Sequence, residues 1–381
     1  MHTPLWPSSL RRAGSVVLWT VLWLVLVDLA VNLVLDPRWA GGQRLASVSR
    51  YFNFGRSVEG KLVQTLGPKA DRPNAVVAAG WIDPAQWQQT LPAASQGGGD
   101  LLVAVYGQSF AFNTVKAMAA LDGRMTPRLI GGPAAPLSHS YAAYRADAAL
   151  RRADVVVVGI LASSLGKADA LSGLSWNFES PAPFTYPKFA LQPGAAELTE
   201  TSPVLGTEQA FRTAFAERGP AWQAFKAQLR EHDQGYDAFA FNQAVWDHSA
   251  LVRLVRRGWV SSRQHYAVTR PAPEGGDQLA VARVLLARVQ QLAAARGEPL
   301  VVVLFQDRGA EVNLVQALGP TLDALGVRYI ATDTFFAATD PAQFIADGHY
   351  TEAANAQVAA ALLEAVRPAR AFAGAVTPPG P

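Results

Sequence analysis

The sequence predicts an α/β protein, in which a parallel β-sheet with helices on both faces is attached to one membrane-spanning helix. Two observations predict the sheet. Short apolar runs alternate with amphipathic stretches along most of the chain, and the runs are apolar throughout, as in strands buried on both faces. The clearest run is Val155–Leu161, with the sequence VVVVGIL. A third observation, a long apolar stretch near the N-terminus, predicts the membrane helix.

The expected elements follow one another in regular order. Strands are predicted at residues 101–106, 128–130, 155–161, 300–305 and 327–330. Helices are predicted at residues 111–121, 140–152, 279–296, 312–325 and 351–366. Alternation of this kind indicates βαβ units and a parallel sheet. The periodicity is lost between residues 165 and 275, which predicts an insertion of roughly a hundred residues.

The remaining boundaries follow from composition. The α/β pattern occupies residues 98–367, including the insertion at 165–275. Residues 36–97 are mixed and rich in Gly, Pro and Gln, and we interpret them as a membrane-proximal region. Residues 368–381 are rich in Pro, Gly and Ala and predict a flexible tail.

The N-terminal apolar stretch is long enough to act as a membrane anchor. Residues 14–35 suffice to cross a hydrocarbon core of about 30 Å. Asp28 interrupts the stretch and costs about 2.5–3.5 kcal/mol if it lies at the bilayer centre. Arg11 and Arg12 precede the span, so the positive-inside rule places residues 1–13 in the cytoplasm. We therefore expect a single-pass protein of the bacterial inner membrane with a periplasmic main domain. A cleaved signal peptide is the alternative, although no clean cleavage site follows the stretch.

Composition and charge exclude several kinds of chemistry. The chain contains no cysteine, which excludes disulfides and thiolate catalysis. No His or carboxylate cluster has metal-ligand spacing and no nucleotide-binding glycine motif occurs, so we expect neither a metal nor another cofactor. The net charge is only +3. The densest basic cluster, Arg253, Arg256 and Arg257, is interpreted as a solvated helix face, and no nucleic-acid partner is expected.

A serine follows the first predicted strand directly. The segment Tyr106-Gly-Gln-Ser-Phe110 places Ser109 at the carboxyl end of a strand and at the start of a helix. Ligands bind at this edge of a parallel sheet, and the free N–H groups of a helix N-terminus can stabilise an oxyanion. Ser109 is therefore a candidate nucleophile. Serine is also a favoured helix N-cap, so this pattern alone leaves both interpretations open.

A candidate base and acid precede the last predicted helix. The segment Asp347-Gly-His349 supplies an imidazole that could accept the proton of a serine and a carboxylate that could orient the imidazole. Asp247 and His248 also place an acid beside a histidine, but within the irregular insertion. His349 is therefore the preferred base, although a surface histidine without a function fits that position equally well.

Two further strand ends could donate hydrogen bonds to an oxyanion. Gly131 and Gly132 follow the second predicted strand, and Ser163 and Ser164 follow the third. The carboxyl ends of neighbouring parallel strands share one edge of a sheet, so these residues should lie near Ser109. Each pair is otherwise ordinary loop sequence.

Together these pieces resemble the SGNH (GDSL-like) hydrolase family over residues 98–165 and 278–367. The segment Gly-Gln-Ser109 is similar to the first family block, Gly132 to the second, and Asp347 with His349 to the fifth. The resemblance implies a three-layer αβα, flavodoxin-like domain. It implies that Ser109, His349 and Asp347 form a triad and that Gly132 contributes to the oxyanion hole, with Ser163 as a substitute donor.

Three positions depart from the family pattern. Gln108 replaces the aspartate of the first block, and the Gly-x-Asn-Asp of the third block is missing, so the oxyanion hole lacks its usual asparagine. Asp347 and His349 are two residues apart rather than three. The Asp-Gly-His variant resembles that of membrane-associated members that act on exopolysaccharides.

The resemblance implies acyl-ester chemistry on an acylated carbohydrate of the cell envelope or an exported polysaccharide. Polysaccharide export or acetylation proteins are the implied partners. Trp176, Phe184 and Tyr186, in the insertion, could form a sugar-stacking wall, although packing explains them equally well. Two alternatives remain: a lipase or lysophospholipase, and a catalytically inactive SGNH-like module that binds carbohydrate or acts as a scaffold.

Overall fold

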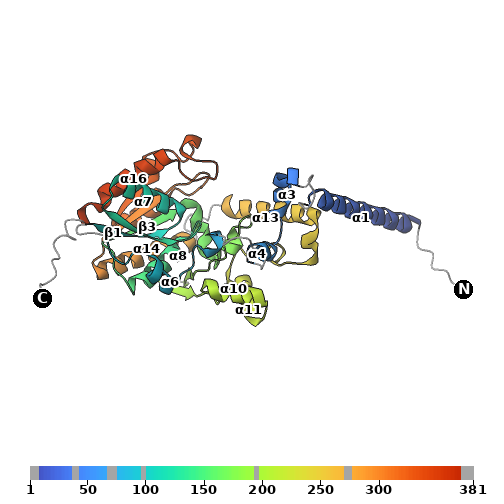
Figure 1. Ribbon diagram of the computed structural model, residues 1–381, viewed down its shortest axis with the longest axis horizontal. Coiled ribbons are helices and arrows are strands. Elements are labelled where there is room, and N and C mark those ends of the chain that lie inside the picture. The colour runs from blue at the N-terminus through green and yellow to red at the C-terminus, as the bar shows by residue number, and fades with distance from the viewer. Residues whose placement is uncertain are drawn as a thin grey trace. The chain divides into compact units, whose positions relative to one another are not determined.

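The computed structural model describes residues 8–36, 43–66, 75–95, 100–192, 197–269 and 277–369. The predicted flexible tail and the first residues of the predicted cytoplasmic segment lie mostly outside these ranges. The chain forms two compact units (Figure 1). The first comprises residues 1–64, 178–180 and 237–263, and the second comprises residues 65–177, 181–236 and 264–381.

The second unit contains a five-stranded parallel sheet. Its strands are β1 (Leu101–Gly107), β2 (Met125–Gly131), β3 (Val155–Leu161), β6 (Leu300–Phe305) and β7 (Arg328–Ala331). Their spatial order is β2-β1-β3-β6-β7, and every neighbouring pair is parallel. This is the 2-1-3-4-5 order of flavodoxin-like sheets, in which the strand order reverses between the first and third strands. Ligand sites in such sheets lie at that reversal, beyond the carboxyl ends of the strands.

Helices cover both faces of the sheet (Figure 1). One face carries α7 (Ser109–Leu121) and α16 (Glu352–Val366), and the other carries α8 (Leu137–Ala148), α14 (Asp277–Arg296) and α15 (Leu314–Ala324). The shorter elements of this unit are α5 (Ala75–Ala78), α6 (Pro84–Thr90), η3 (Thr332–Thr334) and η4 (Pro341–Gln343). The predicted α/β class, with a mostly parallel sheet between two layers of helices, is confirmed.

Strand β3 shows why an uninterrupted apolar run is needed at the centre of the sheet. All seven of its residues are buried. Val156 and Val158 belong to the core on the α8 and α14 face, whereas Val155 and Val157 belong to the core on the α7 and α16 face. Successive side chains of a strand point to opposite faces, so a strand covered on both faces must be apolar at every position.

The chain between β3 and α14 forms small elements rather than further strands of the sheet. These are η1 (Ala162–Asp169), α9 (Gly173–Trp176), β4 (Lys188–Leu191), β5 (Leu198–Thr201), α10 (Glu208–Glu217) and α11 (Pro220–His232). Strands β4 and β5 pair antiparallel, and α10 and α11 enclose the rings of Phe211, Phe215, Trp222 and Phe225. The predicted insertion is not one block, because residues 237–263 belong to the first unit.

The first unit is helical. It contains α1 (Ser8–Val34), α3 (Ala46–Asn53), α4 (Val58–Leu66), α12 (Ala238–Phe241), η2 (Val245–His248) and most of α13 (Ala250–Thr269). Among the described residues, one helical stretch, Arg12–Val34 of α1, is long and apolar enough to cross a membrane. On α13, Arg253 and Arg256 are only 7% and 0% exposed, so interpreting them as part of a solvated face is wrong.

Candidate active site

Ser109 is the first residue of α7 and follows β1 almost directly. Strand β1 ends at Gly107, and Gln108 takes the N-cap position in extended backbone conformation (φ −128°, ψ −176°). The first N–H groups of a helix have no partner within the helix, and they carry the positive end of its dipole. The Ser109 hydroxyl is therefore placed where an anion would be stabilised, at the carboxyl edge of the sheet.

Two contacts connect Ser109, His349 and Asp347 in a row. The Ser109 Oγ is 2.6 Å from the His349 Nε2, although 240 residues separate the two in sequence. The His349 Nδ1 is 3.0 Å from the Asp347 Oδ1. If Nδ1 carries the proton that Asp347 accepts, Nε2 is free to take the proton of the Ser109 hydroxyl. The geometry is that of a nucleophile, a base and an orienting acid.

Packing between α7 and α16 brings the His349 ring to the Ser109 hydroxyl. The His349 ring stacks on the Phe110 ring, with centroids 5.1 Å apart. Tyr350 packs edge-on against the Phe110 ring, with centroids 4.8 Å apart. One helical turn further along each helix, the Thr114 hydroxyl donates to the Asn355 side-chain oxygen at 3.2 Å. Phe110 and Asn355 had no functional signal in the sequence, because their roles depend on which helices pack together.

The loop that presents His349 turns sharply at Gly348. Its φ is +90°, a left-handed conformation that side-chain-bearing residues rarely adopt. The loop closes through the Ile345 N–H, which donates to the His349 carbonyl at 2.8 Å, and the Gly348 N–H, which donates to the Ile345 carbonyl at 3.0 Å. This turn lets Asp347 reach the ring of His349, two residues further along the chain.

Asp347 differs from a buried triad acid because water surrounds it. Its side chain is 63% exposed, against 30% for His349. The backbone N–H of His349, and after it the His349 ring, hold the pKa of Asp347 below its usual value. The carboxylate is therefore charged at neutral pH, but its interaction with the imidazole is weakened by solvent.

Gln108 supports the turn that carries Ser109. Its side chain is fully buried. With its amide oriented to suit its neighbours, the nitrogen donates to the Gly159 carbonyl and the oxygen accepts from the Leu161 N–H, each at 3.2 Å. Gln108 thus ties the end of β1 to the end of β3, which is a positioning role.

The glycines after β2 are required by close backbone packing. Gly131 pairs with Gly107 across the sheet, and a Cβ atom at Gly131 would lie 1.8 Å from the Gly107 oxygen. A Cβ atom at Gly132 would lie 2.7 Å from the Cα atom of Gly80. Because Gly132 follows the end of β2 and Ser109 follows the end of the parallel strand β1, both lie at the same edge of the sheet. Its N–H as an oxyanion donor stays a prediction.

The segment after β3 is held by hydrogen bonds of its own. The backbone N–H of Ser163 donates to the Asp307 side chain at 3.0 Å, and the Ser164 hydroxyl donates to the Leu161 carbonyl at 2.7 Å. Asp307 lies 144 residues further along the chain, so no sequence pattern indicates this contact. Ser163 could reach an oxyanion only through its hydroxyl, because its N–H is already bonded.

The aromatic residues of the insertion do not form an open stacking wall. Phe184 and Tyr186 are 0% exposed, and their rings pack against each other at 5.7 Å. Trp176 is half-buried and donates to the Tyr186 hydroxyl at 3.0 Å. The Lys167 ammonium lies 4.7 Å from the Trp176 ring centroid. For Phe184 and Tyr186, packing is therefore the interpretation that the structure supports, and Trp176 alone keeps an accessible surface.

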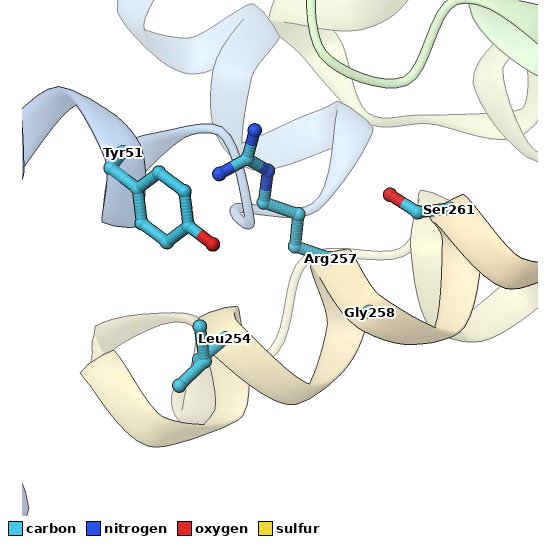
Figure 2. Close-up of a pocket in the computed structure, with 5 residues that line it drawn as sticks. All are labelled: Tyr51, Leu254, Arg257, Gly258 and Ser261. Carbon is cyan, nitrogen blue, oxygen red and sulfur yellow. The ribbon is translucent and has the colours of Figure 1, made fainter.

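Other candidate positions in the described residues have structural explanations. Asp247, beside His248, is 1% exposed and forms an ion pair with Arg256 at 2.6 Å. No cluster of three or more His, Cys, Asp or Glu side chains suited to a metal ion occurs in the part of the chain that the structure describes. A shallow pocket between Tyr51 of α3 and Arg257 of α13 belongs to the first unit and contains none of the predicted catalytic residues (Figure 2).

Comparisons with protein-family models, with curated proteins and with solved structures found no match. The chemistry of this site must therefore be argued from its own geometry.

Proposed function

We propose that this protein is a serine-dependent acyl-ester hydrolase or O-acyltransferase that works through an acyl-Ser109 intermediate. The observation that carries the proposal is the 2.6 Å contact between the Ser109 Oγ and the His349 Nε2, at the carboxyl edge of a parallel sheet. Both side chains are partly exposed, so a substrate can reach them. A histidine within hydrogen-bond distance of a serine at a helix N-terminus is the arrangement that activates a nucleophile.

The proposed reaction has two halves, acylation and deacylation of Ser109. His349 Nε2 takes the proton of Ser109 as the oxygen attacks the ester carbonyl, which gives a tetrahedral oxyanion. The first N–H groups of α7 and the N–H of Gly132 stabilise that charge. His349 then returns the proton to the leaving alcohol, and the acyl group stays on Ser109. Water completes hydrolysis, or a sugar hydroxyl completes transfer, with His349 again acting as the base.

The proposed substrate is an acylated carbohydrate of the envelope or an exported polysaccharide, with acetyl as the favoured acyl group. The site is open, because His349 is 30% exposed and Asp347 is 63% exposed, which suits an ester on a polymer chain. The resemblance to membrane-associated SGNH proteins gives the substrate class. Arg11 and Arg12 at the N-terminal end of α1 favour a periplasmic catalytic domain attached to the inner membrane.

A fluorophosphonate probe tests the proposal. The detergent-solubilised protein should be labelled, and Ser109→Ala should abolish labelling without changing the circular dichroism spectrum. Ser202→Ala, at an exposed position of the same unit, is the matched control and should label like the wild type. A folded wild type that resists labelling, or a Ser109→Ala protein that labels normally, would contradict the proposal.

A catalytically inactive carbohydrate-binding module is the second candidate. One observation favours it: the third-block asparagine is missing, and the Ser163 N–H that could replace it is bonded to Asp307. This candidate predicts no labelling of the folded protein, together with oligosaccharide binding that Ser109→Ala leaves unchanged.

A further inference from the structure

The helix α13 and the turn before it have an inverted distribution of polarity. Apolar side chains are exposed, with Val245 at 82%, Val255 at 65% and Trp246 at 52%. On the same helix, Arg253 and Arg256 are 7% and 0% exposed. Water-soluble helices place their charges outside and their apolar side chains inside. An apolar outside around a charged inside is the arrangement suited to a lipid surrounding.

Arg253 and Arg256 both have bonded partners inside this unit. The Arg256 Nη1 lies 2.6 Å from the Asp247 Oδ1 and also donates to the Gly55 carbonyl at 3.2 Å. The Arg253 Nε donates to the Asp247 carbonyl at 2.6 Å. Both guanidinium groups are turned inward, so neither has to face the exposed apolar surface. The ion pair with Asp247 offsets part of the cost of burying Arg256, whose Nε and Nη2 have no hydrogen-bond partner among the described residues.

Asp28 connects α13 to the apolar helix α1. The Asp28 Oδ1 accepts from the Ser249 hydroxyl at 3.0 Å and from the Leu251 N–H at 2.9 Å, so it caps the first turn of α13. Its other oxygen accepts from Asn32 at 3.3 Å. Along α1, the positions Asp28, Val31 and Asn32 are half-buried, whereas most of the helix is exposed. The residue that interrupts the apolar sequence is thus the contact point for a second helix.

The position of Asp28 in α1 fixes the depth of this contact. The span Arg12–Val34 has 23 residues, which rise about 35 Å. From Asp28 to Val34 a helix rises about 9 Å, and half of a hydrocarbon core measures about 15 Å. When α1 crosses a membrane, Ser249 and Leu251 therefore lie inside the leaflet at the C-terminal end of α1. The stretch from Leu251 to Arg257 rises about 9 Å and can return the chain to the surface.

We propose that residues 245–259 are embedded in the leaflet at the C-terminal end of α1, with the exposed face of Val245, Trp246, Leu254, Val255 and Trp259 against phospholipid acyl chains. The partner of this surface is the bilayer itself. The inference does not depend on the chemistry of Ser109.

The far end of the proposed segment has the composition of a membrane interface. Arg257 stacks on Tyr51 of α3, with its guanidinium carbon 4.0 Å from the ring centroid, and pairs with Glu179 at 2.8 Å. Figure 2 shows Tyr51 and Arg257 beside each other at the pocket that both residues line. Trp259 follows on α13 and is 49% exposed. Tyr, Trp and Arg gather at the level of lipid headgroups, where a ring lies among acyl chains and a polar group reaches water.

Site-specific fluorescence in vesicles tests this inference. The chain has no cysteine, so Val255→Cys carries a single thiol for the environment-sensitive dye NBD. Leu121→Cys, at an exposed position of the second unit, is the control. The full-length protein is reconstituted into phosphatidylcholine–phosphatidylglycerol vesicles. The probe at residue 255 should emit at shorter wavelength and be quenched by brominated lipid, whereas the probe at residue 121 should be quenched by aqueous iodide. Equal iodide quenching at both positions would overturn the proposal, and would point to a soluble protein partner for this face.

Asp28 variants in the labelled Val255→Cys background test the connection. Asp28→Leu makes α1 more apolar, so the anchor stays in the vesicles, but the first turn of α13 loses its acceptor. Brominated-lipid quenching at residue 255 should fall toward the value of the control. Asp28→Asn keeps an acceptor oxygen and should keep the quenching. Unchanged quenching in Asp28→Leu would refute the role of Asp28 in holding α13 in the leaflet.

Discussion

Replacing Asp347 by asparagine measures how much an exposed acid contributes to the proposed catalysis. The substitution removes the charge and keeps an oxygen that can accept the His349 backbone N–H, which Asp347 now accepts at 3.1 Å. The loop around Gly348 should therefore be preserved, and only the electrostatic support of the imidazole should change.

The magnitude depends on the dielectric around the pair. Unit charges separated by 3.0 Å, the distance from His349 Nδ1 to Asp347 Oδ1, interact by about 1.4 kcal/mol in water and about 5.5 kcal/mol at an effective dielectric constant of 20. These energies correspond to factors of about 10 and about 10,000 in rate. Because the Asp347 side chain is 63% exposed, the value for water applies, and we expect kcat/KM to fall about tenfold.

The assay is the hydrolysis of p-nitrophenyl acetate, with kcat/KM compared between variants. Ser109→Ala and His349→Ala should fall to the background rate. Glu352→Gln, which removes another exposed acidic charge near His349 in sequence, should match the wild type. A loss of about a thousandfold or more in a folded Asp347→Asn protein would refute the argument, because it would require the carboxylate to be shielded from water during the reaction.

Three further predictions concern the residues that support the site. Gly348→Ala should destabilise the fold by about 1–3 kcal/mol, because φ is +90° there, and should reduce fluorophosphonate labelling; normal labelling would show that the turn does not position His349. Gln108→Ala leaves the Gly159 carbonyl and the Leu161 N–H without a partner, and urea unfolding should show a loss of about 2–4 kcal/mol, whereas a loss below about 1 kcal/mol would count against the bridge. Burial lowers the pKa of His139 from 6.5 to about 4, so the neutral ring is favoured in the fold and the unfolded chain binds the proton first as pH falls. The stability that comes from keeping His139 neutral is fully present above about pH 6.5. As the pH falls from about 6.5 to about 4, the free energy of unfolding decreases by about 3 kcal/mol. His139→Gln, which keeps a donor for the Gly80 carbonyl, should remove that part of the pH dependence of Tm, and an unchanged pH dependence would contradict the assignment.

The sheet could be predicted because its strands are buried on both faces. A strand such as Val155–Leu161 has to be apolar at every position, which separates it from loops and from amphipathic helices. The contact of Ser109 with His349 agrees with the triad that the family resemblance implied, whereas the local pattern around each residue had left other interpretations open.

The sequence did not predict which polar and aromatic side chains are buried, because burial depends on the neighbour that each helix or loop packs against. The spacing of Arg253 and Arg256 defines one side of a helix, but the same spacing fits a face toward water and a face toward a buried carboxylate. The aromatic residues of the insertion posed the same problem. Phe184 fills the space beside Gly132, 3.2 Å from a Cβ atom placed there, and no local pattern distinguishes this from an open stacking surface.

The distance in sequence between Ser109 and His349 has a consequence for biosynthesis. Ser109 belongs to the first strand and helix of the sheet to be made, whereas His349 precedes the last helix, α16. Chains are synthesised from the N-terminus, and β7 and α16 complete the sheet at the end. A nascent or C-terminally truncated chain therefore carries only an ordinary serine hydroxyl. If Ser109 is the nucleophile that we propose, such a chain lacks the base that would activate it until the segment before α16 has been made.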